Sequence, residues 1–151
     1  MDAIEFLQTE HQKARSAFEK LLAAAPAKRG ALWRELKPEL GTHEKMEEQC
    51  LYGLIARDGA SDPVLSEWVS DRHQDEVYEV ETLITETDGL DPEDARWLAT
   101  VGQIKSALEH HIRREEQDIF PRVSRLWDRT RLEEAGREMR ESKAGKAARR
   151  G

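Results

Sequence analysis

Apolar residues recur every three or four positions along four long stretches of this chain, a period that fits α-helices and not strands. Proline and glycine, which interrupt helices, are sparse and gather mainly between these stretches. They predict helices over residues 2–25, 28–57, 63–87 and 92–120, and a shorter helix over 129–143. Because the connections are short, successive helices should be antiparallel. We expect an all-α fold, an up-down-up-down antiparallel four-helix bundle with a short C-terminal helix.

Particular residues mark the ends of these helices. Asp2, Asp62 and Asp91 stand at N-cap positions, and the last two are each followed by a proline. Pro38 lies inside the second stretch, where we expect a kink or a ragged helix start. Pro121 should kink or break the helix that reaches residue 120.

The length of the chain suggests a single domain, and the distribution of charge distinguishes its basic C-terminal end. The 151 residues suffice for one core, which we assign to residues 1–127, with a C-terminal helix and basic flexible tail over 128–151. Residues 129–151 carry eight Lys and Arg against four Glu, so the net charge of −7 hides an acidic body. That body argues against nucleic-acid binding. No segment resembles a membrane span or a signal peptide, so we expect no membrane partner and a cytoplasmic location.

In every long helix, the apolar residues that should face the interior of the bundle form a stripe, and a histidine interrupts each stripe. In two helices a glutamate follows one turn later. In the fourth helix, His111 continues the stripe of Val101, Ile104 and Leu108, whereas the adjacent His110 points aside. A lone histidine on such a stripe is more often an ordinary core residue, so the pattern counts only as a set. The interrupting residues are His11, His43, Glu47, His73, His111 and Glu115.

Counting residues along the helices predicts that these side chains meet. His11 lies 14 residues before Ala25, and His43 lies 15 residues after Lys28, so both are at a similar height in an antiparallel pair. Glu47 and His73 are likewise equally far from the second connection. The fourth helix fits less closely, and it must be longer or tilted to bring His111 to the same level.

A buried layer of histidines and glutamates needs an interaction that offsets the cost of burying its charges. Burying an ionised carboxylate costs several kcal/mol, which is a large part of a typical stability of about 5–15 kcal/mol. No Lys or Arg occurs on the inward stripes. Imidazole and carboxylate are preferred ligands of iron, manganese and zinc, so a metal centre is the natural interpretation.

At these residues the chain resembles the HHE cation-binding domain of hemerythrin-like proteins. The segments THEKMEEQCLYGLI and HHIRREEQDIFP are similar to that family's paired H-x-x-x-E-E motifs, and the resemblance covers about residues 1–127. It implies a four-helix bundle around two iron ions, an oxo- or hydroxo-bridged di-iron centre. Glu47 and Glu115 would bridge the irons. His11 and His43 would bind one iron, and His73 and His111 the other.

The chain departs from the pattern of the oxygen-carrying hemerythrins, which have a fifth histidine. Its position, four residues after the histidine matching His73, holds Val77 here. Those proteins also typically carry Asp, one residue further on, in place of Glu115. The chain therefore follows a shorter, bacterial four-histidine pattern. Water, Glu44 or Glu76 could take the open coordination position, with the two tyrosines Tyr52 and Tyr78 as further candidates.

The resemblance implies a non-haem di-iron protein that binds or redox-processes oxygen, peroxide or nitric oxide. These small molecules would be its partners, and consumption of peroxide or nitric oxide would make it an enzyme. Two alternatives remain open. The chain could be an iron- or oxygen-responsive regulatory sensor, or a metal-free helical interaction module.

Overall fold

The computed structural model describes the backbone of residues 1–150 and the side chains of residues 1–145. That part of the chain is helical and contains no strand, which confirms the all-α prediction. In chain order, the α-helices are α1 (Ala3–Ala23), α2 (Pro26–Glu47), α3 (Gly53–Asp58), α4 (Pro63–Glu67), α5 (His73–Thr87), α6 (Ala95–Arg114), α7 (Phe120–Leu126) and α8 (Arg129–Arg150). Three π-helical segments join some of them: η1 (Glu48–Tyr52), η2 (Trp68–Arg72) and η3 (Glu115–Ile119).

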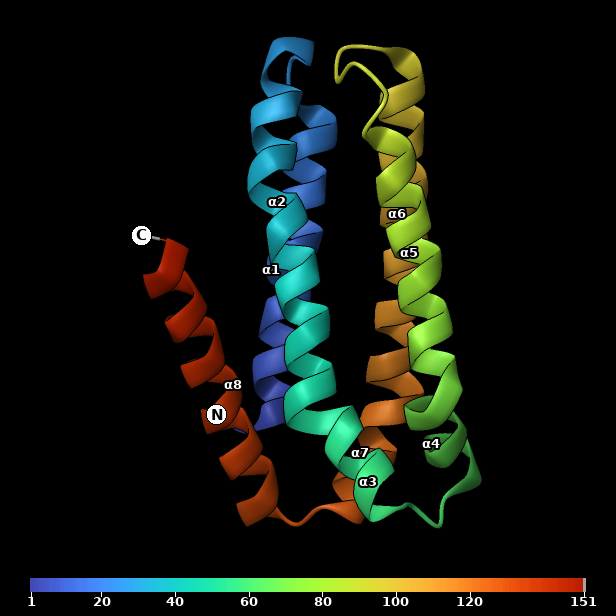
Figure 1. Cartoon of the computed structure of the whole chain (residues 1–151), viewed down its shortest axis with the longest axis vertical. Coiled ribbons are helices and arrows are strands. Elements are labelled where there is room, and N and C mark those ends of the chain that lie inside the picture. The colour runs from blue at the N-terminus through green and yellow to red at the C-terminus, as the bar shows by residue number, and fades with distance from the viewer. Residues whose placement is uncertain (151) are drawn as a thin grey trace.

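The π-helical segments link shorter helices into longer rods. Figure 1 shows α1 beside α2 and α5 beside α6, with the two pairs standing side by side. Helices α3, α4 and α7 continue α2, α5 and α6 at the lower end of this view, and the α1–α2 and α5–α6 connections lie at the upper end. The chain therefore passes along the molecule four times before it enters α8.

Aspartates define several helix starts. The side chain of Asp2 accepts a hydrogen bond from the Glu5 amide, and Asp62 accepts from two amides at the start of α4, as predicted. The prediction for the fourth long helix is wrong by three residues. Asp91 belongs to a turn, where it accepts from the Glu93 amide, and Asp94 is the N-cap of α6. Because α6 starts later than predicted, fewer residues separate its start from His111. The height of His111 in the bundle is therefore closer to that of the other histidines than the sequence predicted.

Neither internal proline breaks its helix. Helix α2 continues through Pro38 to Glu47. Pro121 lies in the first turn of α7, directly after η3, so the predicted break is absent. A π-helical turn already disrupts the i to i−4 hydrogen-bond ladder, and a residue without an amide donor is tolerated beside it.

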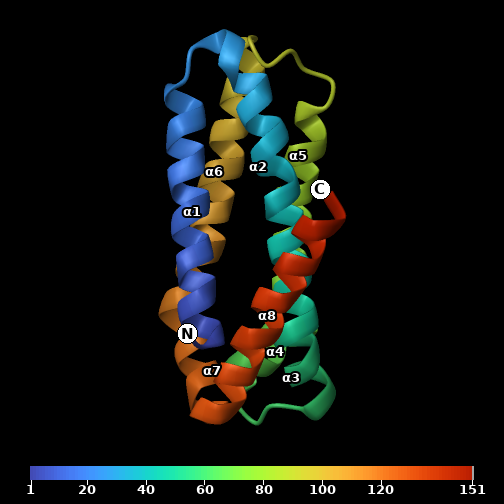
Figure 2. The same cartoon turned by 90° about the vertical axis from the view of Figure 1, so that its left-hand side faces the viewer.

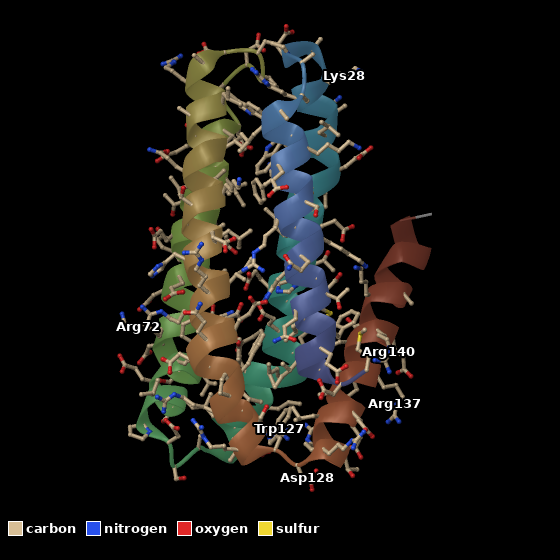
Figure 3. All side chains as sticks on the ribbon, turned by 180° about the vertical axis from the view of Figure 1, so that it is seen from behind. Lys28, Arg72, Trp127, Asp128, Arg137 and Arg140 are labelled. Carbon is tan, nitrogen blue, oxygen red and sulfur yellow. The ribbon has the colours of Figure 1, made fainter. Side chains whose placement is uncertain are left out.

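Helix α8 is much longer than the predicted helix over 129–143. It incorporates the expected basic tail as far as Arg150, and Gly151 lies outside the described residues. Figure 1 shows α8 leaning against the bundle near the N-terminus and diverging from it toward the C-terminus, and Figure 2 shows α8 in front of the bundle. A Cβ atom on Gly136 would lie 2.8 Å from the Met1 carbonyl oxygen, so glycine permits this close approach. In Figure 3, Trp127 and Asp128 mark the turn into α8, and Arg137 and Arg140 lie along it.

The apolar core has two parts. One cluster gathers around Tyr52, Trp68 and Phe120 at the end where α8 begins. The other gathers around Phe18, Trp33 and Trp97 toward the opposite end. The predicted histidine–glutamate layer lies between them in sequence along each rod. None of the described helices is long and apolar enough to cross a membrane.

Candidate metal centre

All six residues predicted from the sequence lie together in the interior. Glu47 and Glu115 are fully buried, three of the histidines are almost fully buried, and His43 is partly buried. They come from the four long rods: His11 from α1, His43 and Glu47 from α2, His73 from the start of α5, His111 from the end of α6, and Glu115 from the start of η3. Their ligand-capable atoms form two groups.

The first group joins His11, His43, Glu47 and Glu115, with one ligand atom of each within 4.8 Å of the others. His43 Nε2 lies 3.2 Å from Glu47 Oε1, one helical turn away. His11 Nε2 lies 3.4 Å from Glu115 Oε1, across the bundle. This group therefore combines residues from three helical rods.

The second group joins Glu44, Glu47, His73 and His111. His73 Nε2 lies 3.1 Å from Glu44 Oε2 and 3.8 Å from Glu47 Oε1. His111 Nε2 lies 3.8 Å from Glu44 Oε1. Glu47 belongs to both groups, so its carboxylate lies between them.

Glu115 also lies between the two groups. Its Oε1 atom is 3.4 Å from His11 Nε2 and 3.3 Å from His111 Nε2. The two histidines of the first group thus share two carboxylates with the two histidines of the second. Two carboxylates therefore lie between the two pairs of histidines.

The spacing of these atoms fits metal coordination. Two atoms that each bind one metal at about 2.0–2.2 Å are separated by about 3–3.5 Å, depending on the angle. Several of the distances above lie in or close to this range. In addition, seven buried atoms in the layer make no hydrogen bond to another protein group: Nε2 of His11, His43 and His111, Nδ1 of His73, both carboxylate oxygens of Glu47, and Oε1 of Glu115. Buried polar atoms that make no hydrogen bond are costly, and a bound cation would satisfy those that face it.

Hydrogen bonds on the far side of two histidines orient their rings. His11 Nδ1 lies 3.0 Å from Glu116 Oε2, and His111 Nδ1 lies 2.9 Å from Glu76 Oε1. In a neutral imidazole, donation from Nδ1 to a carboxylate leaves Nε2 unprotonated, as a metal ligand must be. Glu76 therefore contacts the outer nitrogen of His111, away from the atoms that face the centre.

Tyr52 supports the centre through a carboxylate. Its hydroxyl donates a hydrogen bond to Glu115 Oε2 at 2.6 Å, and its side chain is completely buried. Burial and the nearby Glu115 charge raise the pKa of Tyr52, so the phenol stays protonated and able to donate. Tyr78, the other tyrosine considered from the sequence, is 72% exposed and cannot serve the centre.

Sequence reasoning missed the roles of Glu116 and Tyr52. The paired glutamates at 115–116 gave a signal, but the second of each pair is equally typical of a solvated helix face. Only the three-dimensional structure shows that Glu116 reaches back to His11. Tyr52 was recognised as a candidate ligand, whereas the structure places its hydroxyl on Glu115.

The three π-helical segments lie next to proposed ligands. Segment η1 begins just after Glu47, η2 ends just before His73, and η3 begins at Glu115. A π-helical turn inserts one residue into the helical period, which rotates the chain beyond it, and such turns often occur at functional sites. The insertions let the ligands face the centre while the residues beyond them face a separate apolar cluster.

The carboxylates hold protons on the histidines of the metal-free protein. Burial lowers the pKa of His43, but the nearby carboxylates of Glu47, Glu44 and Glu115 together outweigh it and raise that pKa to about 9. In the same way, Glu44 and Glu47 raise the pKa of His73 to about 11, and Glu115 raises that of His111 to about 9. The pKa of Glu47 is lowered: burial opposes this, but the His43 charge and the contacts with His43 and Glu115 together prevail. Protonated histidines thus compensate the glutamates until a cation replaces the protons.

Four histidines and three glutamates in one buried layer, held by long helices, define a helical metal-binding protein. Residues 2–123 match the family described as the hemerythrin HHE cation binding domain, and the chain belongs to this family. The resemblance stated from the sequence is thereby confirmed. Searches among curated proteins and among solved structures gave no match.

Proposed function

We propose that this protein is a non-haem di-iron protein that binds or redox-processes oxygen, peroxide or nitric oxide. The observation that carries the proposal is the presence of two ligand groups that share Glu47 and are also linked by Glu115. One iron would take His11 and His43, and the other would take His73 and His111. We also propose that residues 1–127 form the metal-binding unit, to which residues 128–151 are attached.

Iron would supply redox chemistry, and the chain's own residues would set its conditions. Glu47 and Glu115 would link the two metals, while Glu116 and Glu76 would keep the histidine rings oriented. Glu44 would take the place left by the absent fifth histidine, since it is the only one of the proposed substitutes that belongs to a ligand group among the described residues. A third carboxylate adds negative charge, which favours the ferric over the ferrous state.

A carboxylate in the place of the fifth histidine supports consumption of peroxide or nitric oxide in preference to oxygen transport. A reversible carrier requires a reduced state that survives contact with oxygen, and an additional carboxylate disfavours that state. Rapid mixing of the di-ferrous protein with oxygenated buffer tests this idea. We expect fast, irreversible oxidation. A protein that takes up oxygen and returns it under vacuum would contradict the proposal.

Metal analysis tests the centre itself. After anaerobic loading with ferrous iron and desalting, we expect two irons per chain, and in the oxidised protein an absorption band in the near ultraviolet. His111→Ala should lose iron, whereas His110→Ala should retain it because His110 is exposed. Binding of a single zinc ion, with no uptake of iron, would refute the di-iron assignment.

A further inference from the structure

A cavity of about 330 Å³ leads from the surface to the candidate metal centre. It lies between α1 and α2, with α6 behind it. Its innermost polar residues are His11, His43, Glu44 and His111. Figure 2 looks onto the face formed by α1 and α2, with α8 crossing in front of its lower part. The cavity therefore connects solvent with atoms of both ligand groups.

The walls of the cavity are apolar. Two alanines of α1, Ala14 and Ala17, face leucines of α2, and their small side chains leave the space open. The remaining apolar wall residues are Leu32, Leu36, Leu40, Leu108 and Ile112. Such walls offer water few hydrogen-bond partners, so they favour an apolar occupant.

The size of the cavity exceeds what a diatomic molecule or peroxide requires. A water molecule occupies about 30 Å³ in the liquid, and a diatomic gas is of similar size. Pockets for small organic molecules range over about 300–1,000 Å³, and this cavity lies within that range. Delivery of oxygen, peroxide or nitric oxide alone does not account for its volume.

Equal numbers of positively and negatively charged residues surround the mouth of the cavity. Lys13, Lys20 and Lys143 line it together with Glu10, Glu35 and Glu39. Lys143 of α8 binds both carboxylate oxygens of Glu10, at 2.6 and 2.7 Å. This mixed rim gives no net preference for an acidic or a basic ligand.

The inner end of the cavity, in contrast, is polar. His11, His43 and His111 line it together with Glu44, and all four belong to the two ligand groups. A ligand with one polar end would place that end here and its apolar body between α1 and α2.

We propose that this cavity binds a small, uncharged organic molecule that has an apolar body and a single hydroxyl-type oxygen directed at the metal centre. This inference deepens the proposed function, on which it rests for the metal, by naming the class of molecule that lies beside the irons. A phenol or a comparable aromatic alcohol is a representative of this class.

Methyl NMR of the full chain, metal-free and zinc-loaded, tests the proposal with 1-naphthol as the probe. We expect shifts for methyl groups of Leu36, Leu40 and Ile112, which line the cavity, and none for Leu65 and Val69 in the other apolar cluster. Naphthalene, which lacks the hydroxyl, should bind at least tenfold more weakly to the zinc-loaded protein. Absence of cavity shifts at saturating probe, or equal affinity for the two probes, would overturn the proposal.

A matched pair of variants separates the cavity from general effects. Ala17→Phe should fill the space and weaken 1-naphthol binding at least tenfold, whereas Ala31→Phe on the exposed side of α2 should not. Equal binding by both variants would exclude the cavity. If Ala17→Phe fails to fold, the wild-type shifts decide alone. Iron stoichiometry is measured separately: two irons without probe binding refute this inference, whereas probe binding without iron refutes the proposed function.

Discussion

At the scale of single residues, Glu44 distinguishes this centre from a four-histidine, two-glutamate site. Its carboxylate lies 3.1 Å from His73 Nε2 and 3.8 Å from His111 Nε2. Burial opposes ionisation of Glu44, but the hydrogen bond to His73 and the His111 charge lower its pKa, which keeps the side chain anionic. An anionic carboxylate at this place is suited to a cation.

Replacing Glu44 by glutamine should therefore weaken one metal position selectively. We expect Glu44→Gln to reduce affinity for the second metal by about 10–100-fold, the range typical of lost groups around a metal. Isothermal titration with zinc would resolve the two binding steps. Glu35→Gln, an exposed glutamate on the same helix, is the control. If both variants bind two metals with wild-type affinity, Glu44 is not a ligand.

Tyr52 gives a second test at this scale. Tyr52→Phe removes the hydroxyl that donates to Glu115 Oε2 and leaves a buried carboxylate oxygen without this hydrogen bond, at a cost of about 1–3 kcal/mol. We expect a lower free energy of unfolding for the metal-free protein, measured by urea denaturation. Tyr78→Phe changes the same atom on an exposed ring and should have little effect. Equal stability of the two variants would show that the hydrogen bond contributes nothing.

The sequence made much of this site predictable, for a physical reason. Six residues were identifiable because a charged or imidazole side chain on an apolar stripe is costly, so each interruption of the period is conspicuous. Glu44 and Glu116 were harder to assign, since each is adjacent to a stripe position and belongs equally well on a solvated face. Their roles depend on helix rotation, which residue spacing does not specify.

At the scale of helices, the π-helical segments were the least predictable feature. An inserted residue changes the period by a single position, and a short apolar run such as Cys50-Leu51-Tyr52 fits an α-helical stripe about as well. Either Cys50 or Leu51 fits such a stripe, and the structure buries both together with Tyr52. Similarly, the start of α6 depended on which of two nearby aspartates caps the helix.

Glycine substitutions test the π-helical geometry of η1. A Cβ atom on Gly53 would lie 2.6 Å from the Glu48 carbonyl oxygen, so Gly53→Ala should destabilise the fold by about 1–3 kcal/mol through overpacking. Gly41→Ala, in α2, meets nothing within 4 Å and should stabilise by about 0.5–1 kcal/mol through helix propensity. Thermal denaturation of the two variants provides the comparison. A stabilising Gly53→Ala would mean that η1 has the ordinary α-helical form.

At the scale of the whole molecule, the polar layer links metal binding to the stability of the fold. It stands between two apolar clusters and draws on all four long rods, so its protonation or metal state affects every helix pair. The metal-free protein retains compensation, because the pKa values of His43, His73 and His111 are raised. Bound metal would replace this compensation with stronger bonds to the same atoms.

The raised histidine pKa values give a signed prediction for stability against pH. Between the ordinary histidine value of 6.5 and about 9, the folded metal-free protein holds protons that the unfolded chain releases. Its free energy of unfolding should therefore fall as the pH rises through this window, and the fall should continue toward about 11 because of His73.

In the zinc-loaded protein the metal holds the imidazoles without those protons, so stability should not fall over the same window. The increase in melting temperature on adding zinc should consequently grow from pH 6.5 to about 9. Thermal unfolding with zinc and with a chelator, at several pH values, measures both curves. A metal-free protein that becomes more stable over this window, or a zinc effect that shrinks as the pH rises, would show that the histidines do not exchange protons for metal.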